Sequence, residues 1–309
     1  MSAKVSVIIP TQNRAKLLPR AIDSVLSQSF KDFELIIIND GSTDGTNELL
    51  KKYQSEDSRI RVITYDSPQG IPIVRNRGMT EATGKYIAWQ DDDDEWLPKK
   101  LEKQVENLDR LPPDYGIVYT GYWRIRKNGK KVYFPPKWVK PTEGDLYRVF
   151  LKKNFLCMQA MLQRKEVFEQ VGGFELEYPV LQEYDWFPRV AKKFKFAYIP
   201  EPLLILHHTP GSNSQNSELN AFVRKMFVKK YNKDLKKFGF LGYHYGIIGD
   251  LLADAKQYNK ASYNLFRAAF HNPLHLTYWV EAILSSLHIN HHKLKVILPF
   301  VSKRKKFDI

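Results

Sequence analysis

The chain has 309 residues, and Lys and Arg exceed Asp and Glu by 48 to 34, which gives a net charge of +14. The single cysteine, Cys157, excludes an intrachain disulfide and favours a reducing compartment, and no apolar run reaches the ~18 residues of a membrane-spanning helix. We therefore expect one large α/β domain with an appendage, no signal peptide, and an anionic partner such as nucleotide, membrane surface or nucleic acid.

The first 120 residues alternate between short apolar runs and stretches with helical spacing. We predict strands at residues 5–9, 34–38, 61–64, 85–89 and 115–120, and helices at 17–26, 46–53, 71–82 and 98–108. This alternation predicts an α/β fold with a mostly parallel sheet flanked by helices. Ligands of such sheets bind outside the carboxyl ends of the strands, where Pro10, Thr11 and Asp40 lie.

Four consecutive aspartates, Asp91 to Asp94, follow the predicted strand at 85–89. Adjacent like charges repel, and no neighbouring Lys or Arg offsets them. Oxygen-rich negative sites at strand ends suit a hard divalent cation, Mn²⁺ or Mg²⁺. The alternative is a solvated acidic loop whose aspartates cap the next helix.

The rest of the chain is less regular at first and then helical. Residues 121–217 are rich in aromatic residues and proline, and Asn128-Gly129 predicts a hairpin turn. Residues from 218 onward look helical, and 243–270 reads as a helix pair similar to one tetratricopeptide hairpin. The alternative for this pair is ordinary helices that pack on the preceding domain.

Four segments carry a family resemblance: VSVIIPTQNR at 5–14, DFELIIINDGSTDGT at 32–46, RNRG at 75–78, and GKYIA at 84–88 followed by the aspartates. Their order and spacing closely resemble those of the family-2 glycosyltransferases, which have the Rossmann-like GT-A fold. The resemblance implies transfer of a sugar from a nucleotide-sugar to an acceptor hydroxyl, with inversion at the anomeric carbon. It divides the chain into a GT-A domain, 1–217, with a nucleotide-sugar half (1–110) and an acceptor half (111–217), and a helical region, 218–309, with a basic tail.

The resemblance also implies roles for residues that match the family's motifs. Asp40 would accept the imide N–H of a uracil, which favours a UDP-sugar donor. Asp93 would contact the metal, Asp92 the ribose, and Asp91 would support the metal shell; the register within the run is open by one residue. The remaining expected contacts to the nucleotide-sugar are Pro10 and Thr11 in the base pocket, Arg75 at the base or phosphates, Asn13 and Arg14.

The general base is expected in the stretch Gln182-Glu183-Tyr184-Asp185. Glu183 takes the position where the family commonly has Asp, and Asp185 is the competing candidate; the alternative is that both only cap a helix. His208 lies near where the family often places a residue over the diphosphate and metal. A structural histidine is the alternative for it.

The C-terminal region is basic and aromatic. Trp and Tyr beside Lys and Arg suit a membrane interface, so we expect a cytoplasmic protein with contact to the inner face of the cell membrane and a glycan or lipid-linked acceptor. The alternative is ordinary packing with a basic tail. His288, His291 and His292 have spacing that could bind zinc, but lack a cysteine or carboxylate at matching spacing, so a solvated face is favoured.

Two other functions remain open at this point. A sugar-phosphate nucleotidylyltransferase would need a Gly-rich basic loop after the first strand, where the chain reads Pro10-Thr11-Gln12-Asn13. The net charge fits a nucleic-acid-binding protein, but the acidic strand ends disfavour it, so no nucleic-acid partner is expected.

Overall fold

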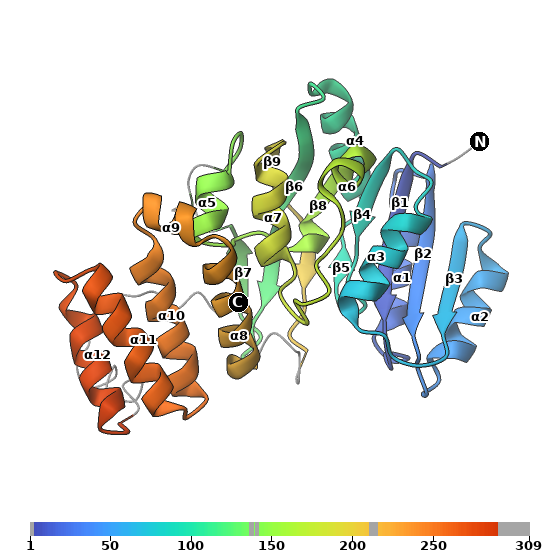
Figure 1. Cartoon of the computed structure of the whole chain (residues 1–309). Coiled ribbons are helices and arrows are strands. Elements are labelled where there is room, and N and C mark those ends of the chain that lie inside the picture. The colour runs from blue at the N-terminus through green and yellow to red at the C-terminus, as the bar shows by residue number, and fades with distance from the viewer. Residues whose placement is uncertain (1–2, 136–138, 140–141, 210–215, 290–309) are drawn as a thin grey trace. The chain divides into compact units, whose positions relative to one another are not determined.

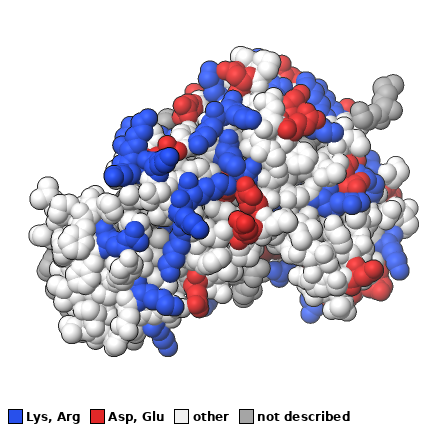
Figure 2. All heavy atoms as spheres, in the orientation of Figure 1, with Lys and Arg blue, Asp and Glu red and all other residues white. Residues whose placement is uncertain are grey.

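The computed structural model describes residues 3–135, 139, 142–209 and 216–289. It divides into two compact units (Figure 1), one formed by residues 1–150 and 154–210 and the other by residues 151–153 and 211–309. On the face drawn in Figure 2, Lys and Arg side chains form several clusters, with Asp and Glu between them.

The N-terminal half of the first unit is a parallel sheet with the order β3-β2-β1-β4. Its strands are β1 (Val5–Thr11), β2 (Phe33–Asp40), β3 (Ile60–Tyr65) and β4 (Tyr86–Trp89). The helices of this half are α1 (Leu18–Leu26), α2 (Thr46–Glu56), α3 (Ile71–Glu81) and α4 (Lys100–Arg110). Every residue of β1 and β4 is buried, which explains why these strands read as unbroken apolar runs. The predicted elements of this half are confirmed.

The other half of the same sheet is mixed. β8 (Met161–Arg164) pairs antiparallel with β4 and with β6 (Tyr115–Ile125), and β6 pairs parallel with β9 (Lys195–Leu206). β5 (Glu95–Trp96) closes the far edge against β9, and β7 (Lys131–Phe134) forms the predicted hairpin with β6. The helices of this half are α5 (Tyr147–Lys152), α6 (Lys165–Val171) and α7 (Glu183–Ala191), with a 3₁₀ turn, η1, at Met158–Ala160.

The second unit is helical among its described residues. Its helices are α8 (Ser217–Lys230), α9 (Asn232–Lys237), α10 (Leu241–Asp254), α11 (Tyr258–His271) and α12 (Leu276–Ser286). The predicted helix pair corresponds to α10 and α11. These two pack so closely that a Cβ on Gly249 would lie 2.5 Å from the Leu265 side chain. Over the described part of the chain, no helix is both long and apolar enough to cross a membrane.

A buried lysine in the core of the first unit gives a testable dependence of stability on pH. Lys100 is fully buried, its amine donates to Gln104 at 2.8 Å, and it lies 3.8 Å from the centroid of the Trp96 ring. Burial lowers the pKa of Lys100 well below its usual value. At pH values between the lowered pKa and the ordinary value near 10.4, the unfolded chain binds the extra proton, so this group's contribution to stability rises with pH.

We expect Lys100→Met to raise the free energy of unfolding at pH 7 by about 1–3 kcal/mol, because it removes an amine whose protonated form is disfavoured in the folded state and favoured in the unfolded chain. The gain over the unmodified chain should shrink as the pH approaches 10. Urea unfolding at pH 7 and pH 10 measures both, with the exposed Lys99→Met as the matched control. A gain that is equal at the two pH values would contradict the assignment.

Candidate functional site

The carboxyl ends of β1 and β2 and a loop after β3 meet at one edge of the sheet. Asp40, at the end of β2, is buried and accepts hydrogen bonds from the backbone N–H groups of Gln69 at 2.6 Å and Gly70 at 3.0 Å. The next residue, Gly41, has φ +63°, and a Cβ there would lie 2.6 Å from the carbonyl carbon of Ser67. Asp40 therefore fixes the loop after β3 at this edge of the sheet, and its contact to uracil stays a prediction.

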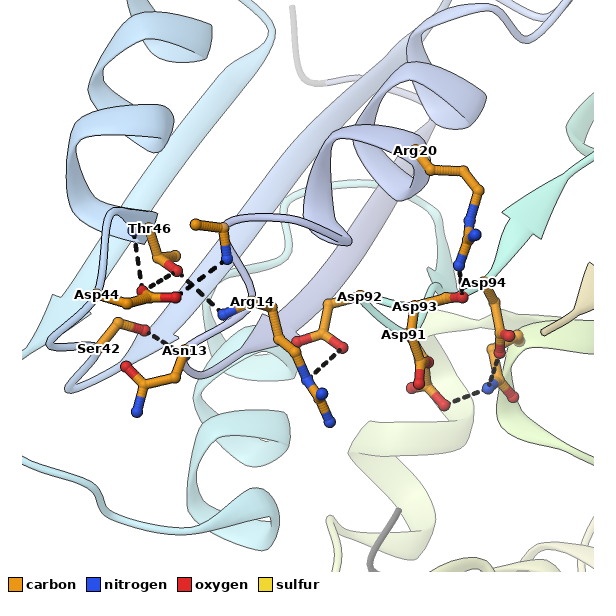
Figure 3. Close-up of polar contacts among 12 residues, drawn as sticks. Asn13, Arg14, Arg20, Ser42, Asp44, Thr46, Asp91, Asp92, Asp93 and Asp94 are labelled. Carbon is orange, nitrogen blue, oxygen red and sulfur yellow. Dashed lines mark hydrogen bonds and ion pairs between the residues drawn. The ribbon is translucent and has the colours of Figure 1, made fainter. Parts of the chain in front are cut away.

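The loops that follow β1 and β2 are joined by hydrogen bonds (Figure 3). The Asn13 backbone N–H donates to the Ser42 hydroxyl at 2.9 Å, and the Asn13 carbonyl side chain accepts from the Thr43 N–H at 2.8 Å. Asn13 takes a left-handed conformation with φ 53°, which Asn tolerates better than most residues. The Arg14 N–H donates to the Thr46 hydroxyl at 3.1 Å. Asn13 thus fixes the loop geometry, while the Arg14 guanidinium is left to face the aspartates.

Pro10 and Thr11 end β1 beside Ile38 and Asn39 of β2. Both are buried. Among the described residues the Thr11 hydroxyl has no partner that satisfies hydrogen-bond geometry, although it lies near enough to Asp92 to lower the pKa of that carboxyl. The structure therefore places Thr11 next to the aspartate run.

Arginines from distant parts of the sequence offset the aspartate run. Arg14 Nε lies 3.7 Å from Asp92 Oδ1, and an Arg75 guanidinium nitrogen lies 3.2 Å from Asp91 Oδ1. Arg20 donates to the backbone carbonyl of Asp93 (Figure 3). The sequence showed no adjacent cation, because these arginines approach through the fold.

The pKa values of three aspartates in the run are raised. Burial raises the pKa of Asp92 to about 7 and that of Asp94 well above its usual value; the charge of Asp93 adds to both effects. Burial likewise raises the pKa of Asp91, whose side chain is 31% accessible, and the Arg75 charge lowers it. The run therefore holds carboxyl groups whose charged forms favour a nearby cation.

This donor set fits a hard divalent cation. Across the described residues, no three His, Cys, Asp or Glu side chains are placed to hold a metal ion by themselves. Mg²⁺ commonly binds through one or two carboxylates together with substrate phosphates and water. The carboxylates of Asp91 and Asp93 can supply such a partial ligand set.

Arg75 connects the aspartate run to the first turn of α7. Its guanidinium donates to the Gln182 side-chain carbonyl at 2.9 Å as well as pairing with Asp91, and its Nε is buried without a hydrogen-bond partner among the described residues. Glu183 is the first residue of α7. Burial raises the pKa of Glu183, Arg75 lowers it and Asp91 raises it, so the Glu183 carboxyl lies within the field of both.

Asp185 has different surroundings. Its side chain is 1% exposed, and Arg189 Nε lies 2.8 Å from Asp185 Oδ2. Arg189 also donates to the backbone carbonyls of Val171 and Gly173, 2.8 and 2.5 Å away. Asp185 therefore belongs to a buried network that anchors α7 to the loop after α6.

Three residues in this site were not expected from the sequence. The Gln159 amide, from η1, donates to both Asp91 and Asp94, and the latter bond is 2.9 Å long. Gln182 receives Arg75, as described above. The backbone N–H of His207 donates to Asp94 at 2.9 Å, and its Nε2 lies 3.1 Å from Glu95 Oε2. Two features of the sequence lay near these contacts: the stretch at 182–185 expected to hold the general base, and the His207-His208 pair.

His208 is exposed, and its contact to diphosphate and metal stays a prediction. His288 Nε2 lies 3.0 Å from the Asn259 side-chain carbonyl. His291, His292 and the basic segment at 293–306 lie outside the described residues, so the zinc and tail interpretations remain untested there.

The first unit is an α/β protein that gathers acidic and arginine side chains at the carboxyl ends of parallel strands, the edge at which ligands of such sheets bind. The family model described as "Glycosyl transferase family 2" matches residues 6–172. The chain belongs to glycosyl transferase family 2.

Two relatives show the range of the sequence similarity. The putative teichuronic acid biosynthesis glycosyltransferase TuaG of Bacillus subtilis is 34% identical over 173 residues, which cover 56% of this chain and 65% of that protein. An uncharacterized glycosyltransferase, MJ1057, of Methanocaldococcus jannaschii is 32% identical over 243 residues, which cover 76% of this chain and 81% of that protein. The match spans less than two thirds of TuaG and only 34% of an uncharacterized glycosyltransferase of Rickettsia bellii.

Solved structures share the fold. TarS 1–349 of S. aureus in complex with UDP-GlcNAc has a TM-score of 0.61 at 18% identity and covers 96% of this chain and 87% of its own. The mannosyltransferase PcManGT from Pyrobaculum calidifontis, in complex with GDP-Man and Mn²⁺, has a TM-score of 0.61 at 17% identity, with coverage of 96% and 88%. The expected GT-A type of fold is confirmed.

Proposed function

We propose that this protein is a metal-dependent, inverting glycosyltransferase that moves a sugar from a nucleotide-sugar to an acceptor hydroxyl. One observation carries the proposal: Arg75 pairs with Asp91 and with Gln182, so a single guanidinium joins the metal-side carboxylates to the turn that bears Glu183. An inverting transfer needs a leaving-group site and a base on opposite sides of the sugar. One guanidinium nitrogen of Arg75 contacts Asp91 on the proposed leaving-group side, and the other contacts Gln182 beside the proposed base.

The donor side consists of the strand ends and the aspartate run. Asp93 is proposed to contact the metal with support from Asp91, and Asp92 to contact the ribose. A bound Mn²⁺ or Mg²⁺ would neutralise the diphosphate and stabilise charge on the leaving group. Arg14 and Arg75 offer further positive charge to the phosphates. His208 is proposed to contact the diphosphate and the metal.

Glu183 is proposed as the general base. Its carboxyl has a raised pKa, as suits a base that must hold a proton after taking it from the acceptor hydroxyl. Asp185 is engaged by Arg189 in a buried ion pair and is therefore the weaker candidate.

The donor is proposed to be a UDP-sugar, on the strength of Asp40 at the end of β2. The structural neighbours bind UDP-GlcNAc in one case and GDP-Man in the other, so the base must be tested directly. Two relatives are named as glycosyltransferases of teichuronic acid biosynthesis and of PGL/p-HBAD biosynthesis. These names support an acceptor that is a cell-surface glycan or a glycolipid.

A thermal-shift panel tests donor class and metal together. We expect UDP-sugars to raise the melting temperature more than GDP-sugars, and the shift to grow when Mn²⁺ is present. At a hundredfold excess over Kd, binding stabilises the folded state by about 2.7 kcal/mol, which corresponds to a rise in melting temperature of roughly 5–11 °C for a domain of about 150–250 residues. Mn²⁺ alone is the control. A larger shift with GDP-mannose would overturn the uridine assignment, and an equal shift without metal would overturn the metal assignment.

Membrane contact is proposed for the second unit. Leu274 and Leu276, which precede and begin α12, are 95% and 72% exposed, and Ile283 and Leu287 are also exposed. Exposed apolar side chains gathered on one segment are typical of an interaction surface. The basic segment at 293–306 would add attraction to anionic lipid.

We expect the double variant Leu274→Glu, Leu276→Glu to have a partition coefficient on anionic liposomes at least tenfold lower than that of the unmodified chain. Burying each leucine in the membrane contributes about 1.5–3 kcal/mol, and the partition coefficient is measured by sedimentation. Leu176→Glu, at a 61% exposed leucine of the first unit, is the matched control and should sediment normally. A chain that ends at Ile289 tests the basic segment separately. Unchanged sedimentation of the double variant would remove the proposed membrane contact.

A further inference from the structure

The second unit contains a pocket of about 650 Å³ that the proposed function does not use. It is lined mainly by α8, α10 and α11, and all its lining residues belong to the second unit. Small-molecule sites typically enclose 300–1,000 Å³. The pocket therefore has the size of a site for a compact ligand, and its chemistry identifies the kind of ligand.

The lining is cationic. Lys225 and Lys229 come from α8, Lys260 and Arg267 come from α11, and the described lining includes no Asp or Glu. The surrounding protein and the charge of Lys260 lower the pKa of Lys225, while Glu218 raises it. Cations on two helices thus repel each other at this pocket. A bound anion would relieve that repulsion.

Two tyrosines orient the arginine. The Arg267 guanidinium lies 3.9 Å from the centroid of the Tyr245 ring and 5.6 Å from that of Tyr263, and it donates to the Tyr245 hydroxyl. A guanidinium held in this way presents its planar fork to phosphate oxygens in a fixed direction. Tyr263 is 62% exposed. Its ring therefore offers an apolar face with a polar edge beside the cations.

We propose that this pocket binds a phosphate-bearing saccharide, with the phosphate against Arg267 and the lysines and the sugar ring against Tyr263. The inference concerns binding by the second unit and is independent of the reaction proposed for the first. A nucleic-acid strand needs an extended groove that follows its backbone, whereas an open pocket of about 650 Å³ with exposed cations has the size for one or two sugar units.

Isothermal titration of the full chain with glucose 6-phosphate tests the proposal. EDTA is added so that no metal occupies the aspartate run. We expect saturable binding, with glucose and inorganic phosphate each at least tenfold weaker. Lys260→Glu should weaken glucose 6-phosphate at least tenfold, whereas Lys237→Glu, the same charge reversal at an exposed lysine outside the lining, should stay within twofold. Asp93→Ala should not change the affinity, because that residue belongs to the first unit.

Arg267→Lys keeps the positive charge but removes the planar guanidinium. We expect its affinity for glucose 6-phosphate to fall fivefold or more. This variant provides the test if Lys260→Glu fails to fold. Unchanged affinity in a folded Lys260→Glu or Arg267→Lys variant would overturn the proposal. If inorganic phosphate bound as tightly as glucose 6-phosphate, the sugar ring would contribute nothing to binding, and the proposed saccharide contact would be wrong. Lys260-dependent binding of phosphatidylglycerol vesicles or a short single-stranded oligonucleotide, without binding of glucose 6-phosphate, would assign the pocket to that ligand instead.

Discussion

Glu183→Gln is expected to lower kcat by about 10²- to 10⁴-fold, the usual contribution of a positioned general base. Glutamine keeps the size of the side chain and its place at the start of α7, but it cannot accept the acceptor's proton. Donor affinity, measured by the thermal shift with a nucleotide-sugar, should stay within about threefold. A variant that keeps more than a tenth of the wild-type kcat would exclude Glu183 as the base.

The pH profile gives a second, independent readout for Glu183. The pKa of this carboxyl is raised by burial, and the base must be ionised to act, so kcat/KM should fall as the pH drops through a value above the ordinary glutamate pKa near 4.3. Glu183→Asp should retain partial activity with a profile of the same sign.

The variant Asp185→Asn tests whether Asp185, rather than Glu183, is the general base. Removing one partner of the buried pair with Arg189 should cost about 3–5 kcal/mol of stability, measured by urea unfolding. In the fraction that remains folded, the pH dependence of kcat should be retained. A stable Asp185→Asn variant without activity would exchange the two roles.

Asp93→Ala is expected to reduce Mn²⁺-dependent transfer by about 10²- to 10³-fold, in line with the loss of one electrostatic contact to the developing charge. Initial rates of sugar transfer across a Mn²⁺ titration measure the effect. If the residual activity of the variant saturates, it should do so only at a higher Mn²⁺ concentration. Equal activity of the variant and the unmodified chain would remove Asp93 from the metal site.

Asp94→Asn is the matched control within the run. Burial and the charges of Asp93 and Asp91 raise the pKa of Asp94 well above its usual value, so asparagine, which has nearly the same shape, removes a charge that this site disfavours. We expect this variant to stay within tenfold of normal activity. A greater loss than in Asp93→Ala would shift the metal contact by one residue.

The strands and helices of the nucleotide half could be predicted because each carries its own periodicity. β1 and β2 are continuous apolar runs, as is usual for strands in the core of a sheet, and the apolar residues of 98–108 recur with helical spacing. The strand ends then indicated the edge of the sheet where a ligand is expected to bind. These are local signals, and a single sequence displays them directly.

The environment of the aspartates could not be predicted in the same way. Arg75 reaches Gln182 across 107 positions and Gln159 reaches Asp94 across 65, and neither glutamine is marked by a periodic pattern. Burial of a carboxylate beside an arginine depends on the mixed half of the sheet, whose strand order β4-β8-β6-β9-β5 has no local signature. The side chain of Asn13 joins two loops, a role that no local pattern marks, and its contact to the nucleotide-sugar stays a prediction.

The hydrogen bond from His207 to Asp94 spans 113 residues of chain. At about 5–20 residues per second, a ribosome needs roughly 6–23 s to proceed from one partner to the other. Throughout that interval β4 can pair with β1, but β5 still lacks its partner strand β9, and Asp94 lacks the donor from His207. The metal-side residues therefore emerge early and reach their final surroundings only after β9 has been made. A ribosome that stalls between residues 100 and 200 would hold a nascent chain in which β5 lacks its partner strand and Asp94 lacks the donor from His207, and an unpaired strand edge favours aggregation and proteolysis.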